Sequence, residues 1–478
     1  MNKRKAITLY IYINLLLSMS AQTLNSLYFM DKWSLSHRSN ASFAPEYGYV
    51  SVPFMGSSQF SISSNLGLSS FLFPTDAGLV TFMHPSVSSS EFINSLQANN
   101  FFSQESNNNL ISVGFYGKNS EFWSFGLSLK EQLNMNLPID LFRLAKIGMA
   151  GSANHYDLKD MSFRNTYIGE MSIGYSQDID PQWRLGGKVK FLAGLVSANI
   201  NYSQFDVDLS QQTWHAQAKG EMLLNSQFMH LGQDADGYLD FGNYNLNLSG
   251  FKPSGYGISI DFGATYKPVD IEGLTLGLSF SDFGFMTWRR TSWQRGVADN
   301  SFTFNGFQNV DYTNFDLKAQ LETLQKDALK LVKFKEEIGV DEYKLQELPA
   351  TWNMSAEYSL MKDENRELLV GALWNSRYIE NRIFTELLGA VTLKPFTWMT
   401  SSLTYSIVAN KPRTLGFALN FSPKWINVFL AFDGINTRLN RQLIPIDPFY
   451  TAIQAGVTIP LSQNTKDRNT ARKFRLLR

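Results

Sequence analysis

The sequence contains no cysteine. A lipid-anchored lipoprotein is therefore excluded, because its anchor requires an N-terminal cysteine. The absence also fits an oxidising compartment in which a free thiol is unwanted, although a cytoplasmic protein without cysteine is compatible with it too. A surplus of either charge is likewise missing, since 42 basic residues balance 42 acidic ones. This balance gives no reason to expect nucleic acid as a partner.

Long apolar runs are also missing. No segment beyond the N-terminus stays apolar for about 18 residues, so no transmembrane helix is expected. Mean hydropathy is −0.18, which argues against a helical membrane protein. A membrane β-barrel remains compatible with this value, because only every second residue of its strands faces lipid.

The N-terminus has the three parts of a secretory signal peptide. Lys3–Lys5 is positively charged, Ala6–Leu17 is mostly apolar, and small residues follow. The apolar stretch is shorter than the ~20 residues that a membrane span needs. We therefore predict a signal peptide over residues 1–21, cleaved after Ala21 or, alternatively, after Ser20. The competing interpretation is a buried N-terminal helix.

Beyond residue 58 the chain alternates between apolar and polar residues. Between Trp398 and Ile407 the odd positions hold Met, Ser, Leu, Tyr and Ile, whereas the even positions from 400 hold only Thr and Ser. Such two-residue periodicity indicates strands with two different faces. We predict fourteen strands near residues 58–70, 109–116, 121–132, 162–175, 183–199, 255–266, 274–286, 351–360, 367–376, 382–393, 397–408, 413–422, 426–434 and 449–461.

A soluble sandwich would also alternate, so strand length and turns must decide. Most predicted strands have about 9–12 residues, which exceeds the ~5–6 of soluble sheets and suits a tilted crossing of a bilayer. The connections tend to alternate between short and long, as in bacterial outer-membrane barrels. The fold class is therefore predicted as all-β, a transmembrane antiparallel barrel over residues 58–461 with both termini in the periplasm. Tryptophans near strand ends suit the aromatic girdles of such a barrel: Trp183, Trp288, Trp374, Trp398 and Trp425.

Four segments fall outside the predicted wall. Residues 22–57 are rich in aromatic residues and are predicted to form an N-terminal hatch in the lumen, since disordered leaders are aromatic-poor. Helical periodicity predicts helical insertions in extracellular loops, at residues 138–148 and about 316–339. The second helix is interpreted as a cover over the barrel mouth or, less favoured, a partner-binding helix. Residues 462–478 form a basic periplasmic tail, interpreted as a solvated end rather than a contact for lipid headgroups or a partner.

Residues with recognisable catalytic or metal-binding spacing are not found. The five histidines lack metal-ligand spacing, and no nucleophile elbow or phosphate-binding loop is present. Asp234–Asp240 leaves calcium open as the minor alternative to an acidic hairpin turn. We expect no catalytic residue, metal or cofactor. The charges expected to face the lumen, and so to tune passage or hold the hatch, are Glu170, Lys188, Lys190, Asp261, Lys267 and Glu357.

Several segments resemble Bacteroidota outer-membrane barrels of a family of unknown function, which are similar in architecture to FadL-like fatty-acid transporters and PorV-like proteins. The segments that carry the resemblance are Tyr28–Met30, His37–Ala41, Gly186–Gly194, Ser254–Lys267, Ser281–Phe285 and Leu348–Pro349. The resemblance implies a fourteen-strand barrel with an N-terminal hatch, no enzymatic activity and no assigned binding residues. Relatives often have Asn-Pro-Ala where this chain has Asn40–Ser42.

These observations lead to two hypotheses about function. The first is a monomeric barrel in the bacterial outer membrane, in contact with outer-membrane lipid, which lets small hydrophobic or amphipathic molecules pass. The second is a non-transporting barrel that acts as a subunit or scaffold of a secretion or surface-assembly complex. An enzyme is not expected. The sequence leaves the transported molecule and the partner proteins open.

Overall fold

The computed structural model describes residues 25–463 except 77, 150–152, 248, 250–251, 290–291, 307–316, 338–343, 364–365, 380–381, 409–410 and 437–448. The predicted signal peptide and nearly all of the predicted basic tail lie outside the described residues. Within these limits, no helix is long and apolar enough to cross a membrane.

The described strands close into one antiparallel barrel with fourteen wall positions. Around the ring the order is β5, β6, β8, β9, β13, β14, β18, β19, β20, β21, β22, β23, β24, and then a position shared by β1 and β2, which returns to β5. The wall strands are β1 (Tyr47–Ser51), β2 (Ser57–Ser64), β5 (Asn99–Tyr116), β6 (Phe122–Pro138), β8 (Ser162–Asp178), β9 (Trp183–Ser210), β13 (Gly255–Tyr266), β14 (Leu274–Trp288), β18 (Ala350–Lys362), β19 (Glu367–Ile379), β20 (Arg382–Phe396), β21 (Met399–Val408), β22 (Lys411–Phe421), β23 (Asn427–Asn436) and β24 (Phe449–Gln463). Each of the fourteen predicted strands overlaps one of these positions.

The wall begins earlier than the predicted residue 58. β1 already pairs with both β24 and β5, as β2 does after it. The two strands are separated at residues 52–56, where Phe54 has a φ of 61°. The backbone keeps hydrogen bonds to β24 and β5 there, such as Phe54 N–H to the Leu110 carbonyl oxygen at 2.9 Å. The expected hatch segment of residues 22–57 therefore includes one wall strand. The part that lies off the wall is residues 25–46, named the N-terminal segment below.

The two faces of the wall have opposite polarity, and the apolar face points outward. On β9, Phe191 is 46 % exposed, whereas the neighbouring Lys190 is 6 % exposed and faces the interior. β20 and β21 follow the same rule, with Val391 and Leu403 exposed and Thr392 buried. A soluble sheet buries its apolar face. The wall has the opposite arrangement, with its apolar face exposed and its polar face buried.

The connections at one end of the barrel are short. Residues 117–121, 179–182, 267–273, 363–366, 397–398 and 422–426 link successive strands there, and this end is named the short-turn end. At the opposite end most connections are long, although those after β19 and β21 contain only residues 380–381 and 409–410. The sequence predicts a large contrast in loop length before Ala350 that nearly vanishes at these two loops, and the strand bounds agree with both parts of this prediction.

Aromatic side chains gather near the short-turn end. Trp183 packs on Tyr266 with ring centroids 4.5 Å apart, and Trp398 stacks on Phe396 at 5.0 Å. Trp288, which we predicted to belong to an outer girdle, is instead 1 % exposed. Trp288 is buried because β14 continues into a packed region that includes Leu192 and Met286. Its indole Nε1 donates a hydrogen bond to Gln346 Oε1 at 2.9 Å.

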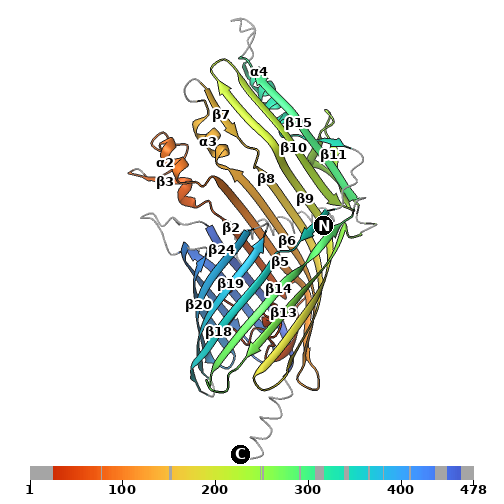
Figure 1. The fold of residues 1–478 in the computed structure, drawn as a ribbon, viewed down its shortest axis with the longest axis vertical. Coiled ribbons are helices and arrows are strands. Elements are labelled where there is room, and N and C mark those ends of the chain that lie inside the picture. The colour runs from red at the N-terminus through yellow and green to blue at the C-terminus, as the bar shows by residue number, and fades with distance from the viewer. Residues whose placement is uncertain are drawn as a thin grey trace, which may run out of the picture.

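Beyond the wall, β9 continues into a sheet that projects from the end opposite the short turns (Figure 1). The long connections supply its other strands, which alternation did not reveal: β7 (Ala153–Asp157), β10 (Trp214–Ser226), β15 (Trp293–Phe304) and β16 (Lys335–Glu337). This region is named the sheet extension. It was expected to be loop.

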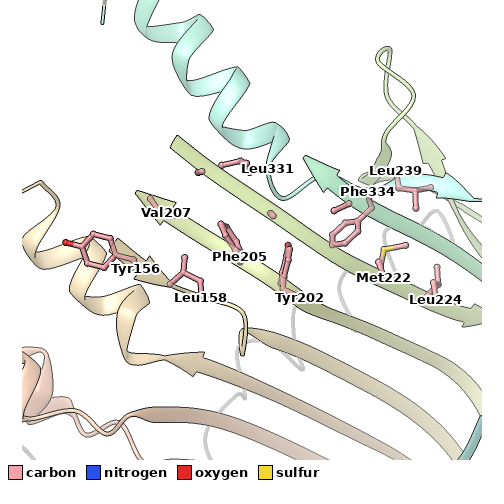
Figure 2. Close-up of a cluster of buried hydrophobic side chains, with 13 residues drawn as sticks. Tyr156, Leu158, Tyr202, Phe205, Val207, Met222, Leu224, Leu239, Leu331 and Phe334 are labelled. Carbon is pink, nitrogen blue, oxygen red and sulfur yellow. The ribbon is translucent and has the colours of Figure 1, made fainter. Parts of the chain in front are cut away.

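One face of the sheet extension carries its own hydrophobic core (Figure 2). Phe205 and Tyr202 of β9 and Met222 of β10 pack beneath Phe334, which is 1 % exposed. Phe334 follows α4 (Leu317–Lys330), which lies inside the expected range 316–339 but ends earlier, because residues 335–337 pair with β15 instead. The helix α3 (Ile139–Ile147) begins after Pro138, as expected, and Gly148 caps it with a φ of 54°.

Smaller elements complete the long connections. Three aromatic rings from the connection before β5, those of Phe71, Phe82 and Phe92, pack together with Phe142 of α3. The remaining elements are η1 (Ser36–Arg38), η2 (Leu68–Ser70), β3 (Leu72–Thr75), β4 (Gly78–Thr81), α2 (Ser89–Asn94), β11 (Met229–Gln233), β12 (Leu239–Leu246) and β17 (Lys344–Glu347).

Candidate functional site in the lumen

The N-terminal segment lies inside the barrel, toward the short-turn end. Most of its side chains are buried, and Leu27, Met30 and Leu35 are 0 % exposed. Trp33 packs edge-on against Phe429 of β23, with ring centroids 5.7 Å apart. A chain of aromatic and apolar residues is thus enclosed by a wall whose inner face is polar.

Hydrogen bonds tie this segment to opposite sides of the wall. The backbone N–H groups of Asn25 and Ser26 both donate to Asp433 Oδ2 on β23, at 2.6 and 3.0 Å. Ser42 Oγ lies 2.6 Å from Thr265 Oγ1 on β13. Six wall positions separate β13 from β23 in either direction, so the segment crosses the full width of the lumen.

Two wall glycines let the segment approach the backbone of the barrel. A Cβ at Gly186 would lie 2.0 Å from the carbonyl oxygen of Ala41, and a Cβ at Gly263 would lie 2.0 Å from Asn40 Oδ1. Any larger side chain at either glycine would displace the segment. Both glycines belong to sequence segments quoted above, and here they have a packing role.

Above the segment, buried charges from five neighbouring strands form one cluster. Lys130 Nζ lies 2.6 Å from Glu170 Oε2, and Lys190 Nζ lies 2.6 Å from Asp261 Oδ1. Asp282 joins the two pairs, because its Oδ1 lies 3.3 Å from Lys130 Nζ and 2.8 Å from Lys190 Nζ. Three of the charges expected to face the lumen therefore meet here.

Two members of this cluster were not predicted. Lys130 lies an even number of residues from the buried Ser124 and Ser128 on β6, so it points to the same, inner face of the wall. The alternation of β6 could therefore have identified Lys130 as a lumen-facing charge. Asp282 is out of phase with the first half of its strand, in which Phe280 faces outward. Its strand shifts register against β13 at this point, and Asp282 takes a φ of 59°. This β-bulge turns inward a position that would otherwise face outward.

The other predicted charges are distributed along the lumen. Lys188 is buried, donates to the carbonyl oxygen of His37 at 3.1 Å and lies 3.9 Å from Asp261, so it connects the cluster to the N-terminal segment. Lys267 and Glu357 do not join the cluster. Both line a cavity of about 930 Å³ at the short-turn end. Lys267 is exposed there because it lies in the turn that follows β13.

A second ion pair crosses the lumen above the segment. Arg377 Nη1 on β19 lies 2.6 Å from Glu105 Oε2 on β5. Six wall positions lie between these strands in either direction, so the pair joins opposite sides of the barrel. It borders a cavity of about 210 Å³ whose floor includes Tyr28, Trp33 and Arg38 of the segment. Two features therefore extend across the lumen: the N-terminal segment and the ion pair between Arg377 and Glu105.

Most of these charged side chains of the lumen form ion pairs with one another. In the described part of the chain, no group of three or more His, Cys, Asp or Glu side chains could hold a metal ion. Residues 234–238 close the β11–β12 hairpin, and Asp234 is engaged by Lys333 Nζ at 2.6 Å.

Comparisons with known proteins give one family of unknown function and several similar solved structures. Residues 41–433 match the sequence profile described as a family of unknown function, DUF5723. Among curated proteins, none matches the chain. The toluene transporter TbuX of Ralstonia pickettii is similar in structure, with 7 % identity, a TM-score of 0.40, and coverage of 88 % of this chain and 91 % of TbuX.

Two further solved structures have similar values. The toluene transporter TodX of Pseudomonas putida has 11 % identity and a TM-score of 0.37, with coverage of 94 % of this chain and 95 % of TodX. A FadL homologue of Pseudomonas aeruginosa has 10 % identity and a TM-score of 0.35, with 91 % and 92 % coverage. The fold assignment rests on the strand pairing of this chain itself.

Proposed function

The chain belongs to the family of unknown function DUF5723, and we propose that it is a monomeric outer-membrane barrel that lets small hydrophobic or amphipathic molecules pass. The N-terminal segment serves as its hatch. The observation that carries the proposal is the position of this segment, which crosses the lumen between Asp433 and Thr265.

The outer surface of the wall supports a membrane location. Exposed apolar side chains recur on every second residue of neighbouring strands, as with Phe191, Ile260 and Leu403. Such a continuous apolar surface is unfavourable in water and matches the lipid-facing band of a membrane barrel. The aromatic pairs at the short-turn end suit one membrane interface, and its short turns favour the periplasmic side for this end.

The contacts of the segment support a hatch that can move. Part of its contact with the wall consists of hydrogen bonds and ion pairs, such as Lys394 Nζ to Asp31 Oδ2 at 2.8 Å, beside apolar packing such as that of Trp33 on Phe429. Water can replace such bonds, so each contributes only ~1 kcal/mol net. Polar groups around the 210 Å³ cavity favour an amphipathic molecule over a purely apolar one.

A reversible lock tests the hatch. Ser34 Oγ lies 2.8 Å from Thr458 Oγ1 on β24, which brings the two positions within reach of a disulfide. Because the chain has no other cysteine, S34C/T458C would form one defined cross-link. We expect the oxidised variant to stop uptake of a fluorescent amphipathic probe into proteoliposomes, and a reductant to restore it.

The matched control places a disulfide within the wall. Thr392 Oγ1 and Ser402 Oγ are 3.0 Å apart on the neighbouring strands β20 and β21, and neither belongs to the segment. Oxidised T392C/S402C should take up the probe as the unmodified chain does. Equal uptake by the locked and control variants would refute the hatch.

The sheet extension favours a second candidate, a scaffold for a secretion or surface-assembly complex. β10 and β15 build a separate packed unit that the barrel does not need for closure. Cross-linking in cells that carry the full chain, or a chain without α4 or residues 464–478, would test this role. Recovery of the same proteins with all versions would show that neither segment is the docking site.

A further inference from the structure

The cavity above the N-terminal segment is enclosed by groups that form hydrogen bonds. Its volume is about 210 Å³. A cavity of roughly 150 Å³ holds a benzene molecule, so this one has room for a small substituted ring or a molecule of similar size. Gln59, Asn107 and Gln454 of the wall are among its lining residues. A long acyl chain does not fit within it.

Donor groups around this cavity lack partners. Arg38 Nη2 donates to Asn107 Oδ1 at 2.8 Å, but Arg38 Nη1 is buried and has no partner among the described residues. The same holds for Nε1 of Trp33, which also lines the cavity. A buried donor without an acceptor is costly, so the two groups together indicate a ligand that supplies acceptor oxygens.

The remaining charges of the cavity are already engaged. Arg377 pairs with Glu105 at 2.6 Å, and Lys130 pairs with Glu170 and Asp282. Arg38, in contrast, forms no ion pair with any carboxylate in the described part of the chain. Glu131 also lines the cavity and accepts a hydrogen bond from the Tyr167 hydroxyl at 2.6 Å. Among the described cationic side chains of the cavity, Arg38 is therefore the one that forms no ion pair.

We propose that this cavity binds a small organic carboxylate, about the size of benzoate, which Arg38 holds through its guanidinium. A guanidinium presents paired N–H donors that match the two oxygens of a carboxylate. The aromatic floor of Tyr28 and Trp33 receives the body of the ligand. The proposal rests on the proposed function, because the ligand must enter the lumen.

Isothermal titration calorimetry on the purified full-length chain in detergent tests the proposal, with benzoate and its neutral analogue benzamide as probes. Benzoate should bind more tightly than benzamide by roughly tenfold or more, and R38Q should remove this preference. The matched control is R143Q, because Arg143 is half exposed on α3 and pairs with Asp140 outside the lumen. It should leave both affinities unchanged.

A second variant keeps the test decisive if R38Q does not fold. Ser61 lines the cavity and is 2 % exposed, so S61L fills the space while Arg38 remains. We expect S61L to abolish benzoate binding. The proposal is wrong if benzoate does not bind, if benzamide binds equally well, or if both R38Q and S61L bind benzoate normally. Passage is not measured in this assay, so its failure leaves the lock experiment to judge the hatch independently.

Discussion

The close approach of the N-terminal segment to Gly186 makes a quantitative prediction. In G186A the new Cβ would lie 2.0 Å from the carbonyl oxygen of Ala41, about 1 Å closer than such atoms tolerate. The segment must move away. This movement puts at risk the hydrogen bond that Arg184 Nε donates to the Ser42 carbonyl oxygen at 2.9 Å and the one between the Ser42 and Thr265 hydroxyls at 2.6 Å. Overpacking costs about 1–3 kcal/mol and each lost hydrogen bond about 1 kcal/mol.

A destabilisation of about 3 kcal/mol raises the population with a displaced segment by roughly 100-fold. Maleimide labelling of S34C measures this population, because Ser34 is 5 % exposed and the chain has no other thiol. We expect labelling of S34C to be faster by about that factor in the G186A background. A barrel band that shifts on heating in gel electrophoresis would show that the wall itself is folded.

Gly389 provides the control for this experiment. It also lies in the wall, on β20, but a Cβ added there would meet nothing within 4 Å. G389A should therefore leave the labelling rate of S34C unchanged. If G186A labels no faster than G389A, the segment is not packed against the wall as described, and the steric reasoning fails.

Three further predictions concern the buried charges and the sheet extension. D261N should destabilise the barrel by about 3–5 kcal/mol in urea unfolding, because it breaks a buried ion pair, whereas D299N on the exposed sheet should have little effect. The hydrogen bond from His155 to Asp208 at 2.8 Å raises the pKa of His155, helped by the nearby acids. The contact thus stabilises β7 fully at a pH below the ordinary histidine pKa, and this stabilisation is lost as the pH rises through the pKa of His155 in the folded protein. Histidine NMR titration should show the raised pKa of His155, and an unshifted value would contradict the prediction. F334A should cost the sheet extension about 3–5 kcal/mol, seen as faster hydrogen exchange in β10 with β13 unchanged; equal effects on both strands would refute a separate core.

The strands of the wall could be predicted because their signal is local. A wall strand needs only its own alternation to be recognised, and each of the fourteen shows it. The sheet extension was missed since the covered face of β10 and β15 is built largely from small residues, including Ala216, Ala218 and Ala298. Such residues carry little hydrophobic contrast, although they are buried in the same core as Phe334.

The site could be predicted only in part, for a different reason. Inward phase identified Glu170, Lys190 and Asp261, but it could not show which charges meet. Glu105 and Arg377 are 272 positions apart in the chain and pair only because the ring closes. The bulge at Asp282 shifts the phase itself, so the alternation of residues 274–280 does not extend to that carboxylate.

Ion conductance in planar lipid bilayers tests most directly whether the N-terminal segment closes the barrel. The full chain should show almost no conductance, and a variant without residues 25–46 should show discrete open-channel steps. The variant must first give a heat-shifted barrel band, so that a folded wall is established. Full-chain conductance equal to that of the variant would contradict the account, because the lumen would then be open with the segment in place.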